Sequence, residues 1–108
     1  MTDKHTEALP TVLNRVIVAI VGDYDRRASI LRRRAAAPDV LDRYHAINRA
    51  IDEAIAEVCE PAICRQIRLD IGEGRGARRT PLYFLGEGLY KKRKREAKES
   101  IAKHLLLL

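Results

Sequence analysis

The chain of 108 residues contains no tryptophan, one phenylalanine and only two cysteines. Cys59 and Cys64 lie five positions apart without a second pair, which fits neither a zinc ribbon nor a redox Cys-x-x-Cys motif. We expect both to be reduced, half-buried thiols of a cytoplasmic protein. A small secreted domain held together by disulfides is therefore excluded.

Long hydrophobic runs are also missing. The N-terminus is polar, and the apolar stretch from Val16 to Val21 soon reaches Asp23, so we predict neither a signal peptide nor a membrane span. The sequence has no internal repeat and no alternating apolar run typical of strands. Since 46% of the residues are hydrophobic, one core can form, and residues 1–108 are predicted to fold as a single all-α domain.

Groups that could perform catalysis or bind a metal are few and scattered. His5, His45 and His104 are far apart in the sequence, which does not resemble the spacing of metal ligands. Ser29 and Ser100 have no nearby His and Asp that would activate a hydroxyl nucleophile. We therefore expect a protein that is not an enzyme and that needs no metal or cofactor.

Apolar residues at three- and four-residue steps predict a helix from about Pro10 to Ala36, in which Gly22 introduces a kink. Pro38 ends this segment, and Asp39 is predicted to cap a second helix that reaches about Cys59. Joined by a short turn, the two helices are expected to pack as a long antiparallel hairpin. This hairpin, residues 10–59, would be the scaffold of the domain.

Charges of opposite sign gather on the two sides of the turn. Arginines crowd the end of the first helix, at Arg26, Arg27 and residues 32–34, whereas Asp39 and Asp42 open the second. These signs suit the negative and positive ends of the two helix dipoles. We interpret this pattern as structural, because it needs no ligand.

The remainder of the chain, residues 61–107, is predicted to form a helix-turn-helix part. A short helix runs from Pro61 to Gly72, which is expected to lie just past its end, and a glycine-rich connector without a P-loop signature follows. Next come a capped helix over 80–85, a turn over 86–88 and a basic amphipathic helix over 89–106. The apolar arc of this last helix is predicted to contain Tyr90, Ala97, Ile101, Leu105 and Leu108.

The net charge of +6 is concentrated in the same part of the chain. Residues 75–103 contain ten basic and three acidic residues, whereas the rest contains eleven basic and twelve acidic residues. A near-neutral scaffold thus carries a cationic surface, which favours a polyanionic partner.

The positions of the basic side chains suggest how they would contact double-stranded DNA. Lys91, Lys92 and Arg95 would enter the major groove, and Arg78 and Arg79 would hold phosphates. The expected DNA contacts are Arg78, Arg79, Lys91, Lys92, Lys94, Arg95 and Lys98. Lys98 is included because it lies on the same outward side, and Lys94 because of the resemblance given below. If about five phosphates are neutralised, the slope of log affinity against log salt concentration should be ~−4.5. A solvated basic face or a localisation signal is the alternative interpretation of residues 91–95.

Three segments together resemble the ArpU/RinA-like regulators of phage late transcription. They are Asp23-Tyr-Asp-Arg-Arg27, the segment Leu41-Asp-Arg-Tyr-His-Ala-Ile-Asn48, and Gly88 to Leu105 with its Tyr90-Lys91-x-x-Lys94-Arg95 pattern. The last segment is also similar to the promoter-reading C-terminal region of sigma factors. The resemblance implies a sequence-specific transcriptional regulator of phage or prophage origin that uses Lys91, Lys94 and Arg95 to contact DNA, with Tyr90, Ile101 and Ala102 on the packing side of the helix.

An alternative function from another class is phage assembly. A small terminase subunit would oligomerise through the hairpin and bind packaging DNA, and the four leucines at 105–108 favour burial against another subunit. A homodimer is the expected oligomeric state, because helix-turn-helix proteins often read paired half-sites. RNA polymerase is a further candidate partner if the protein is a regulator.

Overall fold

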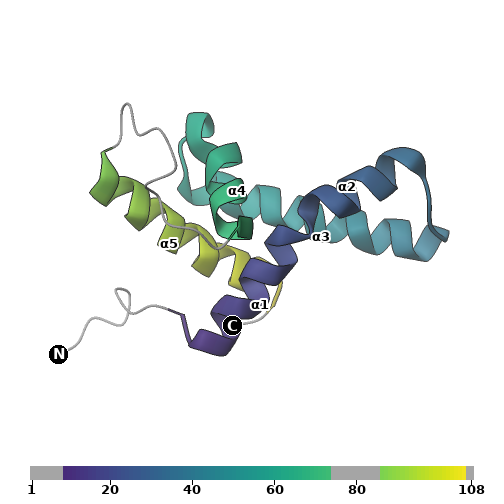
Figure 1. The fold of residues 1–108 in the computed structure, drawn as a ribbon, viewed down its shortest axis with the longest axis horizontal. Helices are drawn as coiled ribbons and strands as arrows, with labels where there is room; N and C mark the ends of the chain where they lie inside the picture. Colours follow the sequence, from purple (N-terminus) through teal and green to yellow (C-terminus); the bar gives the residue numbers. More distant parts are fainter. Residues whose placement is uncertain (1–8, 74–85, 107–108) are drawn as a thin grey trace.

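The computed structural model describes residues 9–73 and 86–106. Its elements are α1 (Thr11–Gly22), α2 (Tyr24–Arg33), α3 (Pro38–Val58), the 3-10 turn η2 (Pro61–Ile63), α4 (Cys64–Glu73) and α5 (Glu87–His104) (Figure 1). These two ranges contain helices and no strand, which confirms the all-α prediction. None of the helices in them combines the length and the apolar character that a membrane span requires.

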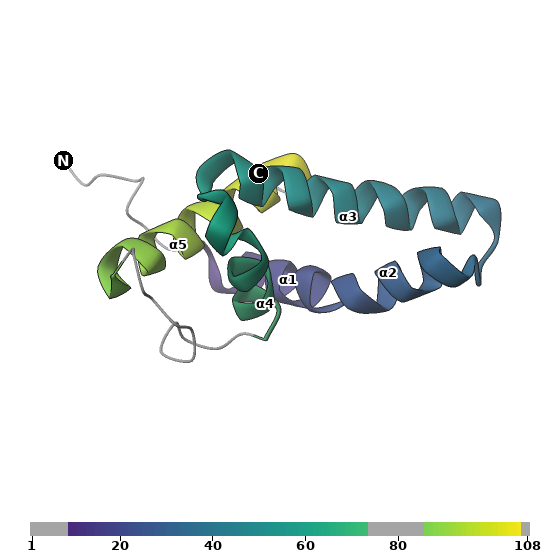
Figure 2. The ribbon, with the colours of Figure 1, turned by 90° about the horizontal axis from the view of Figure 1, so that it is seen from above.

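The first predicted helix is divided into α1 and α2 at Asp23. Beyond this break the two parts have different neighbours, since α1 packs mainly against α4 while α2 packs against α3. Figures 1 and 2 show α2 beside the first half of α3, with α1 turned away from this pair. The antiparallel hairpin expected over residues 10–59 is therefore limited to α2 and α3.

Two glycines explain why α1 leaves the hairpin. A Cβ atom at Gly22 would lie 2.9 Å from the carbonyl oxygen of Gly72, and one at Gly72 would lie 3.1 Å from the Cα of Gly22. The backbones of α1 and α4 therefore approach more closely than any other residue type permits. Gly72 was expected just past the end of its helix, but it lies within α4, where it makes room for α1.

Two predictions about helix starts have different outcomes. Asp39 is not the N-cap of α3, because Ala37 occupies that position and Pro38 is the first helical residue. Proline fits there since its missing N–H would have no partner within the helix. Pro61, in contrast, begins η2 at a first helical position as predicted, and α4 follows without interruption.

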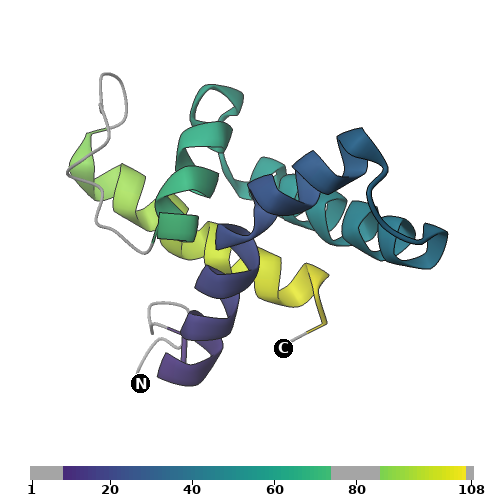
Figure 3. The same ribbon diagram turned by 45° about the vertical axis from the view of Figure 1, so that its right-hand side comes forward.

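The core lies where α1, α4 and α5 meet the second half of α3. Isoleucine dominates it, and Tyr90 is the largest fully buried side chain. The buried apolar residues are Ile17, Val21, Ile51, Ala54, Ile55, Cys59, Ile63, Ile67, Ile71, Tyr90, Ala97, Ile101 and Ala102. We call these helices, with α3 from Asn48 onward, the body, and residues 24–47, which project from it in Figures 2 and 3, the arm.

A buried arginine ties the arm to the body. The guanidinium of Arg27 donates to Oδ1 of Asn48 at 2.7 Å and to the carbonyl oxygen of Ile20 at 2.5 Å. Asn48 in turn donates to the carbonyl oxygen of Tyr24 at 3.2 Å. Burial lowers the pKa of Arg27 from its ordinary value, and the negative charge of Asp23 opposes this decrease. The buried charge is tolerated because each nitrogen of the guanidinium has a hydrogen-bond acceptor.

Candidate nucleic-acid interface

The basic helix expected over 89–106 is found as α5, and its inner face agrees with the predicted apolar arc. Tyr90, Ala97 and Ile101 are fully buried, and Leu105 packs at the edge of the core. Leu108 lies outside the described residues. Because α5 is held mainly by α3, its opposite face is directed to solvent.

A buried hydrogen bond anchors the start of α5. The hydroxyl of Tyr90 donates to Oδ2 of Asp70 on α4 at 2.8 Å, and both side chains are buried. A charge-assisted hydrogen bond in the low dielectric of the core is stronger than one at the surface. This bond therefore fixes the turn of α5 that carries the adjacent lysines.

The predicted DNA contacts fall into three groups. Lys91 and Lys92 are exposed and Arg95 is half-buried, all on the outward side of α5. Lys94 and Lys98 are half-buried at its flank. The remaining two candidates, Arg78 and Arg79, lie outside the described residues, as does the short helix predicted over 80–85. The described part of the site is consequently α5 itself.

The two half-buried lysines, Lys94 and Lys98, interact with other parts of the protein. Nζ of Lys98 donates to Oδ1 of Asn14 on α1 at 3.1 Å. Desolvation lowers the pKa of Lys94 and also that of Lys98, which the neighbouring charge of Lys94 lowers further. For Lys94 the negative charge of Asp70 opposes this decrease. Both lysines therefore take part in interactions within the protein.

Arg93 is neutralised by carboxylates from two directions. Its guanidinium lies 3.1 Å from Oε1 of Glu60, before η2, and 3.1 Å from Oε1 of Glu96 on its own helix. The hydrogen bond from Arg93 lowers the pKa of Glu60, and the same bond raises the pKa of Arg93. The spacing of Arg93 and Glu96 is visible in the sequence, whereas the pairing with Glu60 is not.

The outward surface that remains is formed by Lys91, Lys92 and Arg95, and we call it the basic face. It lies in the first half of α5, next to the turn that the Tyr90–Asp70 bond anchors. Such a cationic surface on a rigid helix can bind phosphates and reach base edges in a groove.

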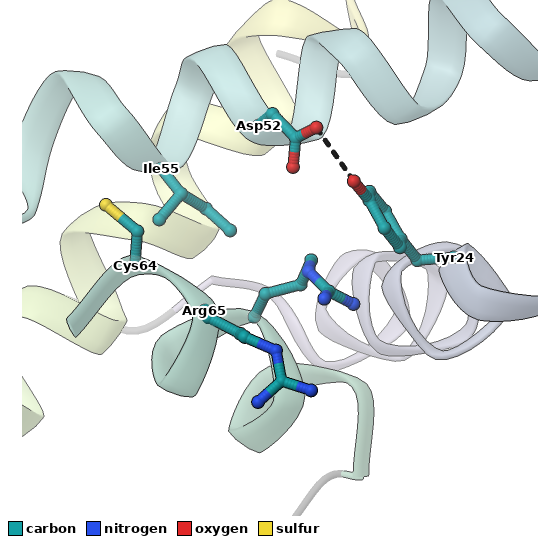
Figure 4. Close-up of a pocket in the computed structure, with 6 residues that line it drawn as sticks. Tyr24, Asp52, Ile55, Cys64 and Arg65 are labelled. Carbon is teal, nitrogen blue, oxygen red and sulfur yellow. Dashed lines mark hydrogen bonds between the residues drawn. The ribbon is translucent and has the colours of Figure 1, made fainter. Parts of the chain in front are cut away.

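A pocket lies where the arm meets the body (Figure 4). This pocket of about 220 Å³ contains Tyr24, whose hydroxyl donates to Asp52 at 2.8 Å, and Arg68, which stacks on the Tyr24 ring at 3.9 Å. Arg68 also pairs with Asp25 at 3.3 Å, while Arg65 points away from Asp52 in Figure 4. Since most of its polar groups bind one another, the pocket is better explained as a joint between α2, α3 and α4.

The thiols and imidazoles of the described residues lie in different surroundings. Cys59 and Cys64 are free, and burial raises the pKa of Cys59 to about 12, which disfavours its thiolate. His104 lies 2.7 Å from Glu57, whereas His45 is exposed on α3. Within residues 9–73 and 86–106, no three His, Cys, Asp or Glu side chains form a group that could hold a metal ion.

No protein family, curated protein or solved structure matches this chain.

Proposed function

We propose that the protein binds double-stranded DNA through the basic face of α5. The observation that carries this proposal is the division among the basic side chains of one helix. Lys91 and Lys92 are exposed and share the outward side with Arg95 next to an anchored turn, whereas Arg93 faces Glu60 and Lys98 faces Asn14. A polyanion with evenly spaced charges fits this surface, because each cation can neutralise a separate phosphate.

We further propose that binding serves sequence-specific regulation of transcription, as the resemblance to the ArpU/RinA-like phage regulators implies. A rigid helix whose first half carries basic side chains on its outward side can place Lys91 and Arg95 against base edges, where arginine and lysine recognise guanine. The alternative is a packaging protein such as a small terminase subunit. For that function, contacts to phosphates alone would suffice.

The variant Lys91→Ala/Arg95→Ala tests the DNA proposal. Both side chains extend from α5 away from the core, so the variant should unfold at the same temperature as the parent. Loss of two phosphate contacts should weaken binding to a fluorescent DNA duplex about tenfold to a hundredfold and decrease the salt slope by ~1.8. Fluorescence anisotropy over a series of salt concentrations measures both quantities.

The matched control is Arg15→Ala/Arg65→Ala, which removes the same charge from exposed positions on α1 and α4. This control should bind DNA nearly as well as the parent chain. Equal affinities of the parent and the α5 variant would contradict the proposal, as would an equal loss in the control.

Competition separates the two uses of DNA binding. A regulator should prefer promoter fragments from the neighbourhood of its own gene over scrambled duplexes by a factor of about a thousand or more. A packaging protein should show a much smaller preference.

A further inference from the structure

The arm is packed differently from every other part of the described structure. Between Arg27 and Asn48 no residue is buried, although the segment contains several large apolar side chains that are only half-covered. These half-covered side chains are Ile30, Leu31, Val40, Leu41, Tyr44 and Ile47. With 10 residues, α2 is also shorter than the length at which a helix becomes stable without packing. The arm therefore has apolar surface that another protein surface could bury.

Near the tip of the arm, this surface is hollowed into a groove of about 370 Å³ between α2 and α3. Leu31 and Leu41 contribute its apolar part, while Arg34 and Asp42 contribute charges of opposite sign. The groove thus combines half-exposed leucines with a cation and an anion. Such a surface suits a helical partner whose own surface carries apolar side chains and charges of both signs.

The charges around the tip form no ion pairs within residues 9–73 and 86–106. Arg32, Arg33 and Arg34 end the α2 side, and Asp39 and Asp42 begin α3. Within the described residues, none of these five takes part in an ion pair. At the base of the arm the situation is the reverse, because Arg26 pairs with Asp23 at 2.6 Å.

We propose that the occupant of this surface is the arm of a second copy of the same chain. In a twofold dimer each patch faces an identical patch, so a patch that holds both signs of charge can satisfy itself twice. The arginine cluster of one copy would lie against Asp39 and Asp42 of the other, and the half-covered leucines would close the space between them. A partner of a single charge sign would leave one of the two clusters unpaired.

Light scattering and sedimentation of the full chain, without DNA, test this proposal independently of the DNA-binding function. The parent chain should be a dimer that dissociates on dilution. Two reversals, Arg32→Glu/Arg33→Glu and Asp39→Arg/Asp42→Arg, should each weaken the dimer on the order of a hundredfold, because like charges then face each other. Circular dichroism verifies that each variant retains its helices.

An equimolar mixture of the two variants provides the decisive observation. In a mixed dimer the introduced glutamates of one copy face the introduced arginines of the other, and at the second contact the retained Asp39 and Asp42 face the retained Arg32 and Arg33. The mixture should therefore recover the dimer that neither variant forms alone. Arg15→Glu/Lys103→Glu is the control with the same change in charge as the first variant, located outside the arm, and it should remain dimeric. A monomeric parent chain, a dimer insensitive to both reversals, or a mixture that stays monomeric would overturn the proposal.

Discussion

The two ends of the molecule differ in the signs of their surface charges. At one end, the first half of α5 presents Lys91, Lys92 and Arg95 on an anchored helix, with one sign of charge. At the other end of the long axis, the tip of the arm presents arginines and aspartates together (Figures 1 and 2). A surface with one sign needs a partner of the other sign, whereas a surface with both signs can pair with its own copy. Two distinct binding functions can therefore coexist in one small chain.

The ends differ in packing as well as in charge. The basic face is supported by a core of fully buried residues such as Ile67 and Ile101, while the arm beyond Arg27 has none. Side chains on the body are consequently positioned by the chain itself. Those on the arm depend more on what covers them.

The largest expected difference between the body and the arm is the loss of stability when an apolar side chain is shortened. Ile67→Ala is expected to lower the free energy of unfolding by about 2–5 kcal/mol, because it opens a cavity in a fully buried region. Leu41→Ala, on the half-covered arm, should cost about 1 kcal/mol in the dilute, monomeric chain. Urea denaturation followed by circular dichroism measures both values, and similar losses would mean that the arm is as well packed as the body.

A smaller effect is expected from removing one hydroxyl. Tyr90→Phe deprives the buried carboxylate of Asp70 of a donor and should cost about 1–3 kcal/mol. The matched change on the arm is Tyr44→Phe, whose hydroxyl accepts only a long bond of 3.4 Å from Arg26 and should matter much less. The same denaturation experiment compares them. Equal destabilisation would show that the Tyr90 bond does not anchor α5.

Removing a carboxylate that pairs with Arg93 should increase the positive charge at the α5 end of the molecule. Glu60→Gln removes one of the two carboxylates that pair with Arg93, so the net positive charge beside α5 rises by one although Glu96 still pairs with this arginine. We expect DNA affinity to rise about twofold to fivefold and the salt slope to steepen by up to ~0.9. The control Glu53→Gln removes a carboxylate that pairs with Arg49 on α3, and its DNA affinity should stay close to that of the parent.

The same pair predicts a small dependence of stability on pH. The pKa of Glu60 in the folded chain lies below its ordinary value of 4.5, so this group stabilises the fold above that pH. The contribution disappears as the pH falls through the lowered pKa. Compared with Glu60→Gln, the parent should therefore be slightly more stable at pH 6, and the difference should vanish under strongly acidic conditions. Thermal melts across this range test the sign.

Local patterns were sufficient to predict much of the fold. The helical periodicity identified α3 and α5, and it placed Tyr90, Ala97 and Ile101 on the buried side of α5. It also predicted the exposure of Lys91 and Lys92. These properties depend on neighbours within a few turns of one helix, and for this reason they can be recognised without tertiary structure.

Long-range contacts account for what could not be predicted. The bond from Lys98 to Asn14 joins residues 84 positions apart and gives an expected DNA contact a partner within the protein. The pairing of Arg93 with Glu60 likewise requires η2 to lie beside α5. Similarly, the direction of α1 follows from its crossing with α4, which no periodic pattern reveals.

That crossing has a consequence for how mutations should combine. Since a methyl group at Gly22 or at Gly72 would meet the backbone of the other helix, no rearrangement of side chains can relieve the conflict. The only remedy is to move one helix axis as a whole, and a single such displacement creates room for both methyl groups. The double alanine variant should therefore lose less free energy of unfolding than the two single variants lose in sum. The effects of the two substitutions are thus expected to be non-additive.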